Sequence, residues 1–138
     1  MAEITLRGRK IPLVYTTWEM KQIQEEIAPI GKFTYMIFGR NPDDDEDTSL
    51  YGGPEHLRAV GALIRILGNA GLEEAGEKPD LTDKWVLRSL KPMDLVDVVG
   101  QCMTAFNEGN RSEIPAEQSD EPVDVTLAEM NKKKEKES

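Results

Sequence analysis

The sequence predicts an α+β domain in which an N-terminal β-hairpin packs on about four helices. Two short runs rich in branched and aromatic residues open the chain around a glycine-containing loop. Apolar residues then recur at three- and four-residue spacing between residues 16 and 107. A chain of 138 residues is expected to form one domain of ordinary size, which we place at residues 1–111.

The hairpin is predicted from the runs 3–6 and 10–15, which flank Arg7-Gly8-Arg9. Two extended runs around a three-residue loop that contains glycine are typical of a β-hairpin. Pro12 has no N–H group to donate, so this part of the second run is expected at a sheet edge or at an irregularity.

The first helix is predicted to begin at Thr16, because Glu19 stands three positions later in the capping-box pattern. Its end is marked by Pro29. The following run 33–38 has high β-propensity but is too short for its period to decide, so a strand and a short helix both stay open. The apolar face of the first helix is expected to consist of Met20, Ile23 and Ile27.

The longest helix is predicted over residues 54–71. Gly53 and Pro54 suit its N-cap and N1 positions, and Gly71 suits the position after its C-cap. Between these ends, apolar residues recur at helical spacing, at Leu57, Val60, Leu63, Ile64 and Leu67.

Two more helices are predicted after a polar connection. Thr82 or Asp80 suits the cap of a shorter helix that extends through Leu90. Pro92 then interrupts the chain and starts the last helix, which is expected to end near Asn107. The core stripe of this last helix is expected to consist of Val96, Val99, Met103 and Phe106.

The acidic charge of the chain is concentrated in two segments. The formal net charge is −9, from 17 Lys and Arg against 26 Asp and Glu. Residues 43–47 contribute −5, residues 112–138 hold 8 acids and 4 bases, and the rest of the chain holds 13 of each sign. We therefore expect a charge-balanced body, a mobile acidic loop at about 39–53 and a disordered acidic tail at 112–138.

The composition limits the classes of partner. An isoelectric point near 4.7 argues against a broad electrostatic grip on nucleic acid or on an anionic membrane surface, so neither is expected as a partner. The longest apolar stretches are far shorter than the roughly 20 residues that cross a bilayer, and no secretory signal opens the sequence. We therefore expect a cytoplasmic protein.

The sequence contains no recognisable pattern of catalytic or cofactor-binding residues. It lacks the glycine-rich phosphate loops and the nucleophile elbow, and residues 43–47 fail as an EF-hand because Thr48 stands where that loop needs glycine. The only histidine, His56, is interpreted as a surface residue near a helix start, and the only cysteine, Cys102, as a small core residue. We expect no enzyme activity, no cofactor and no metal.

Several stretches carry a resemblance to a known family. Residues 4–16 read ITLRGRKIPLVYT and lead into a glutamate-rich helix. Residues 63–72 read LIRILGNAGL, residues 79–83 read PDLTD, and residues 91–99 read KPMDLVDVV. Over about residues 3–110 the chain resembles the tail assembly chaperones of long-tailed bacteriophages and their prophage relatives.

The resemblance implies a small α+β protein that is absent from the finished virion. Such chaperones coat the long helical tape measure protein and keep it soluble. They then hand over to the major tail tube protein, whose subunits polymerise around the tape measure. Members of the family can stack along a partner, so self-association along it stays open.

This implied function needs a partner-binding face. In the body we expect exposed apolar residues of the hairpin and of the 54–71 helix to form it. The competing interpretation is that these residues are ordinary core. The candidates are Leu13, Tyr15, Leu63 and Leu67.

The tail offers a second candidate segment. Residues 123–130 are its only apolar part, and Val125 and Leu127 are candidates for folding on a partner and recruiting the tube subunit. The competing interpretation is a solvated tail with scattered apolar residues.

An alternative hypothesis does not depend on the family. An acidic domain without a chemical site is typical of an interaction protein, so the chain could be a regulatory or adaptor protein that binds a host protein through its acidic segments. This alternative predicts salt-sensitive binding that is lost when residues 43–47 are neutralised.

Overall fold

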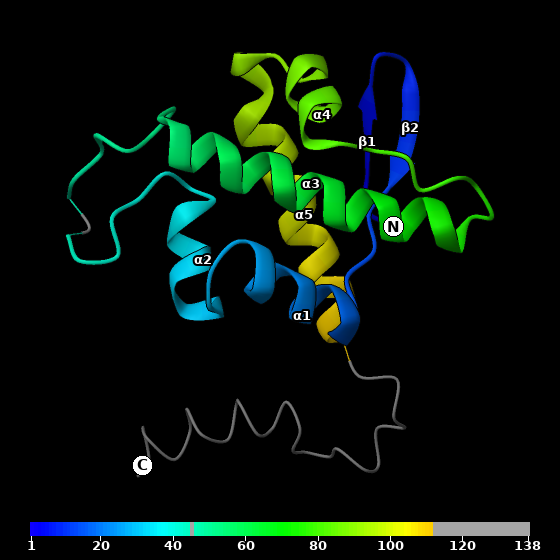
Figure 1. Cartoon of the computed structure of the whole chain (residues 1–138), viewed down its shortest axis with the longest axis horizontal. Coiled ribbons are helices and arrows are strands. Elements are labelled where there is room, and N and C mark those ends of the chain that lie inside the picture. The colour runs from blue at the N-terminus through cyan, green and yellow to red at the C-terminus, as the bar shows by residue number, and fades with distance from the viewer. Residues whose placement is uncertain (45, 112–138) are drawn as a thin grey trace, which may run out of the picture.

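The protein consists of an N-terminal hairpin followed by five α-helices, in a computed structural model that describes residues 1–44 and 46–111 (Figure 1). The predicted α+β class is confirmed. The predicted disorder of residues 112–138 lies outside the described residues. In chain order the elements are β1 (Glu3–Leu6), β2 (Arg9–Pro12), α1 (Thr17–Glu26), α2 (Ile30–Met36), α3 (Pro54–Glu74), α4 (Asp83–Ser89), the 3₁₀ turn η1 (Pro92–Asp94) and α5 (Leu95–Asn110).

The hairpin is tighter than predicted. Arg7 and Gly8 alone form its turn, both with positive φ (52° and 79°), so Arg9 joins the ladder opposite Leu6. Positive φ at both central residues is the type I′ geometry, whose twist matches that of the two strands. The second strand ends at Pro12 rather than at Tyr15.

Helix α3 runs through the middle of the domain and contacts α1, α2, α4, α5 and β2 (Figure 1). It extends to Glu74, beyond the predicted end at Gly71. Gly71 is needed for packing instead: a Cβ atom there would lie 1.8 Å from the carbonyl oxygen of Pro12. The glycine therefore allows the backbone of β2 to lie directly against α3.

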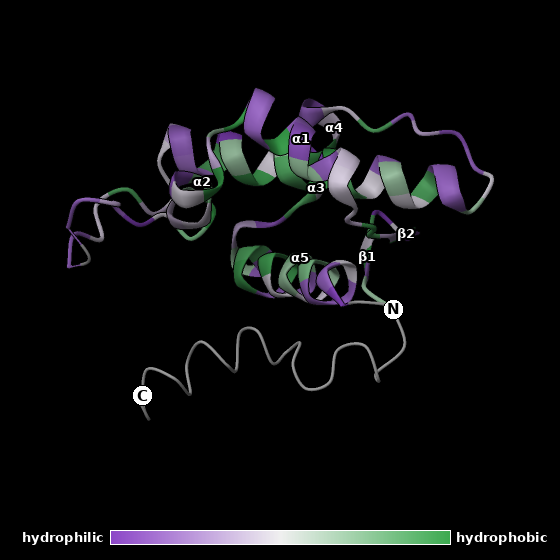
Figure 2. Cartoon of the chain, turned by 90° about the horizontal axis from the view of Figure 1, so that it is seen from below, coloured by the Kyte–Doolittle hydropathy of each residue, from purple (hydrophilic) through white to green (hydrophobic). Residues whose placement is uncertain are grey.

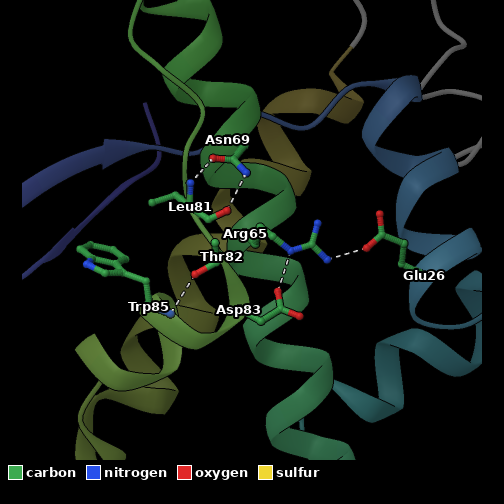
Figure 3. A network of polar contacts seen from close by, with 7 residues as sticks. All are labelled: Glu26, Arg65, Asn69, Leu81, Thr82, Asp83 and Trp85. Atoms are coloured by element: carbon green, nitrogen blue, oxygen red, sulfur yellow. Dashed lines mark hydrogen bonds and ion pairs between the residues drawn. The ribbon is translucent and has the colours of Figure 1, made fainter.

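A polar network fixes the neighbours of α3 (Figure 3). The Arg65 guanidinium donates to Asp83 on α4 at 2.6 Å and also to Glu26 on α1. One turn further on, the Asn69 side chain accepts from the Leu81 N–H (2.9 Å) and donates to the Leu81 carbonyl (3.2 Å). These bonds hold the chain that leads into α4 against α3.

The local signals for the starts of α1, α3 and α4 are confirmed, whereas Pro92 starts the turn η1 and the last helix runs from Leu95 to Asn110 rather than from Pro92 to about Asn107. The Thr16 hydroxyl and the Glu19 carboxylate form both halves of the capping box of α1. Gly53 and Pro54 occupy the N-cap and N1 positions of α3, and Thr82 accepts from the Trp85 N–H at the start of α4.

The buried faces of two helices differ from the prediction. Met20, expected in the core, is 37% exposed, and Val96 is 68% exposed. In α5 the buried residues are Leu95, Val98, Val99, Cys102 and Ala105. Because apolar residues occupy most of the first turn and a half of α5, their spacing alone cannot decide which flank is buried.

The run 33–38, for which strand and helix were both open, belongs mainly to helix α2. Its Phe33 is buried and meets Phe106 edge to face, with ring centroids 5.8 Å apart. Phe106 also meets Tyr15 edge to face at 4.5 Å. This aromatic group joins α2, α5 and the segment after β2.

The glycine contact between α3 and β2 makes a stability prediction. Gly71→Ala should lower the free energy of unfolding by about 3 kcal/mol or more, because the new methyl group overlaps backbone that cannot move without separating β2 from α3. Urea unfolding followed by circular dichroism measures the change.

Gly100→Ala is the matched control. Gly100 is an exposed glycine inside α5, and a Cβ atom there meets nothing within 4 Å. This variant should be more stable than the wild type by about 0.5–1 kcal/mol, through helix propensity alone. Equal effects of the two substitutions would contradict the packing argument.

Candidate functional site

Exposed apolar side chains gather where α2, the turn before α3, and the start of α5 meet. Phe38, Tyr51 and Val96 are 45%, 49% and 68% exposed, and together they line a shallow pocket of about 60 Å³. In Figure 2 the end of α5 that lies toward α2 is the most hydrophobic part of that helix. Three large apolar side chains from separate segments are thus in contact with solvent at one place.

A groove of about 350 Å³ continues from this pocket, because Tyr51 and Leu95 line both. Its walls come from the first turn of α3, the end of α4 and the turn η1. Leu57, Leu87 and Leu90 are only partly covered there. We define the pocket and the groove together as the apolar surface, formed by Phe38, Tyr51, Leu57, Leu87, Leu90, Pro92, Leu95 and Val96.

The turn η1 exposes this surface. Leu90 ends α4 in an extended conformation, and Pro92 starts the 3₁₀ turn, since a proline fits where no N–H is needed. The chain then enters α5 at Leu95, which puts Val96 at its second position, outside the core. Met93, within η1, is 91% exposed.

His56 holds the Tyr51 side of the apolar surface in place. Its Nδ1 accepts from the Gly52 N–H at 2.8 Å, and its Nε2 donates to the Ile37 carbonyl at 3.2 Å, so the ring is the neutral Nε2–H tautomer. The Tyr51 ring lies against it, with centroids 4.7 Å apart. The histidine therefore connects the end of α2 to the turn before α3.

The interpretation of His56 as a surface residue is wrong, because the ring is almost fully buried. Its position in the first turn of a helix usually means exposure, but here the turn 50–53 folds back over it. Burial lowers the pKa of His56, and the bond to the Ile37 carbonyl opposes this only in part.

One basic side chain lines the groove. Lys91 lines the groove, and Arg88 is exposed one turn before it at the end of α4. Within residues 1–44 and 46–111, no ion pair includes either side chain. A partner that carries acidic residues beside its apolar ones would complement this edge.

The four body residues predicted to bind a partner do not form an exposed face. Leu13, Tyr15, Leu63 and Leu67 are all buried, so the competing interpretation as ordinary core is correct for each. All four belong to the hydrophobic core, and beside them the Val14 N–H donates to the Leu67 carbonyl at 3.1 Å. Val125 and Leu127, the two candidates in the tail, lie outside the described residues.

Sequence reasoning did not select the residues that form the apolar surface. The helical spacing predicts Val96 in the core stripe of α5, and Phe38 belongs to the run 33–38, whose period decides neither strand nor helix. For Tyr51 a signal was available: a large aromatic residue stands between an acidic loop and a helix N-cap, where burial is not expected.

A second pocket, of about 520 Å³, lies between the α1–α2 corner and the acidic loop. Lys32, Arg40 and Arg58 line it together with Asp43 and Glu55, so its charges are mixed. The acidic loop itself is organised by local turns, in which the Asp43 N–H donates to Asn41 (2.8 Å) and Asp47 accepts from the Ser49 N–H (2.9 Å). These contacts form local turns within the described part of the loop.

The single cysteine of the sequence, Cys102, lies in α5. It is fully buried in α5, which confirms its interpretation as a core residue. Burial raises the pKa of Cys102 to about 12, so its thiol stays protonated and unreactive at neutral pH. In the part of the chain that the structure describes, no three His, Cys, Asp or Glu residues are grouped so as to hold a metal ion.

No family model, curated protein or solved structure matches the chain. Among the described helices, none is both long and apolar enough to cross a membrane. The apolar surface therefore stands as a candidate site on its geometry alone.

The buried histidine predicts a pH dependence of stability. Its folded pKa lies below the ordinary value of 6.5, so the unfolded chain binds the proton more tightly. The contribution of His56 to the free energy of unfolding should therefore be complete above pH 6.5. It should decrease as the pH falls from there through the folded pKa. Urea unfolding between about pH 7.5 and about pH 5 tests this.

His56→Gln is the control, because a glutamine side chain can accept and donate like the neutral ring but does not titrate. The loss of stability in this pH range should be smaller in the variant. An identical loss in both proteins would show that His56 is not its cause. The carboxylates of Glu108 and Asp47, whose pKa values are lowered, act only at lower pH.

Proposed function

We propose that the chain is a tail assembly chaperone that binds and solubilises the tape measure protein and recruits tail tube subunits. It acts without catalysis, in the cytoplasm of the host bacterium. The observation that carries the proposal is the apolar surface, where Phe38, Tyr51 and Val96 are exposed in a body whose charges otherwise balance. The partners come from the family resemblance of residues 3–110.

The apolar surface suits a helix with an apolar stripe. A long helical tape measure exposes such stripes and aggregates when they stay bare. A groove between two helix ends takes apolar side chains at three- and four-residue spacing, which is the helix-in-groove mode of recognition. The groove offers Leu57, Leu87 and Leu90 as its walls, and Tyr51 continues it toward Val96.

The distribution of charge supports the same function. Residues 43–47 of the acidic loop and the acidic tail together account for the whole net charge of −9. They keep the complex soluble while the apolar surface is occupied, and Lys91 lines the groove, where it favours acidic residues on the partner.

Val96→Asp tests the proposal. The charge should weaken binding of a tape measure fragment by at least about tenfold, because it must be desolvated against the partner's apolar stripe. An acidic side chain at the second position of α5 interacts favourably with the positive end of the helix dipole, so the fold should persist. Co-expression followed by solubility and affinity measurements gives the readout.

Trp18→Asp is the matched control. Trp18 is also at the second position of a helix, α1, and is 61% exposed, but it lies away from the apolar surface. Binding should be unchanged. If both variants bind like the wild type, the assigned surface is wrong; if binding instead falls with salt and with neutralisation of residues 43–47, the adaptor hypothesis replaces the chaperone.

A further inference from the structure

The outer edge of β1 has backbone groups that β2 does not use. The Leu13 N–H donates to the Ala2 carbonyl (3.0 Å), which marks Ala2 and Leu13 as a hydrogen-bonded pair of the ladder. Bonded and non-bonded pairs alternate along an antiparallel ladder. Ile4 therefore bonds to Ile11, while Glu3 and Thr5 direct their N–H and C=O groups to the other edge.

Three of these outward groups have no partner among the described residues. The Glu3 N–H donates to the Gln101 side chain at 3.3 Å. The Glu3 carbonyl and both backbone groups of Thr5 make no hydrogen bond within residues 1–44 and 46–111. An exposed strand edge with free groups is a template for another strand.

A groove of about 340 Å³ lies along this edge. One wall is β1, and the other is formed by the end of α4 and the first half of α5, with Leu90, Lys91 and Val98. Asp94, Asp97 and Gln101 also line this wall, so an extended segment in the groove would lie beside β1 and against both apolar and polar side chains.

The free groups can all pair with such a segment. In a parallel pair, one residue of the added strand donates to the Glu3 carbonyl and accepts from the Thr5 N–H, and the residue two positions later donates to the Thr5 carbonyl. This uses all three free groups. An antiparallel strand would use the same three groups, and the Glu3 N–H stays bonded to Gln101 in either case, so the direction is set by the end at which the segment enters the groove.

The chain outside the structure supplies a matching segment. Residues 123–127 read VDVTL, in which apolar residues alternate with polar ones as in a strand with one buried face. The face of β1 that carries Ile4 and Leu6 is buried, and its other face is exposed. Val125, with Val123 or Leu127, would continue the buried face.

The end of α5, from which residues 112–138 continue, lies beside the N-terminal end of β1, where the groove begins. Glu108, three residues before Arg111, accepts from the Ala2 N–H at 3.1 Å and pairs with the N-terminal amine at 3.3 Å. Residues 112–122 can span up to about 36–40 Å when extended. A segment that starts here and enters at Glu3 runs parallel to β1.

We propose that residues 123–127 add to β1 of the same chain as a third, parallel strand. Val125 is placed beside Ile4 or Leu6, and its N–H donates to β1 in either register. The N–H of Thr126 points away from β1 in both registers. The pairing does not depend on the proposed function.

Two proline variants of the full-length protein test this. Amide hydrogen exchange by NMR should show the Thr5 N–H protected in the wild type, and Val125→Pro should speed its exchange by at least about tenfold, because proline removes the bonded N–H. Thr126→Pro, the matched control, should leave Thr5 protected. The Ile11 amide, bonded within the hairpin, should be unchanged in all three proteins.

Two results would overturn the assignment. One is a Thr5 amide that exchanges equally fast in the wild type and in Val125→Pro. The other is protection of Thr5 that disappears on dilution, since this would mean that the strand comes from a second copy.

Discussion

How closely each element can approach α3 determines the rest of the fold. This helix is buried along most of its 21 residues, and its glycines are placed where neighbours need room. Gly71 admits the backbone of β2, Gly68 admits Leu81, and Gly61 admits Leu87 of α4. Arg65 and Asn69 then fix α1 and the start of α4 through charge-assisted and paired hydrogen bonds. Without these close approaches the short hairpin would have little to pack against, because a two-stranded sheet is at best marginally stable alone.

Local signals predicted much of this fold, whereas long-range contacts could not be predicted. Thr16 with Glu19 and Gly53 with Pro54 act within one turn, so the printed sequence suffices to recognise them. The sequence predicts a helix end at Gly71, but the glycine is needed for its contact with the Pro12 carbonyl. That contact is 59 positions away in the sequence, so the local pattern could not indicate it. His56 is buried where the sequence predicts exposure, and Val96 is exposed where the sequence predicts burial. The reason is the same, because burial depends on which segment folds over a residue and periodicity does not contain that information.

The candidate site follows from incomplete coverage of α3. Along most of its length the helix is enclosed, and the predicted binding residues Leu13, Leu63 and Leu67 are part of that enclosure. Near its N-terminus the turn at Tyr51, the end of α4 and the turn η1 leave a groove between them, so apolar side chains stay in contact with solvent there. A body that keeps such a surface, and places its net charge in residues 43–47 and the tail, fits the role that we propose, a carrier of an apolar partner.

The most direct test of this account is methyl NMR of the Leu, Ile and Val side chains during titration with a soluble helical fragment of a tape measure protein. The account predicts that the signals of Leu57, Leu87, Leu90, Leu95 and Val96 shift, while those of Leu13, Leu63 and Leu67 do not. Binding that moves only the second group, or a titration that moves neither, would contradict it.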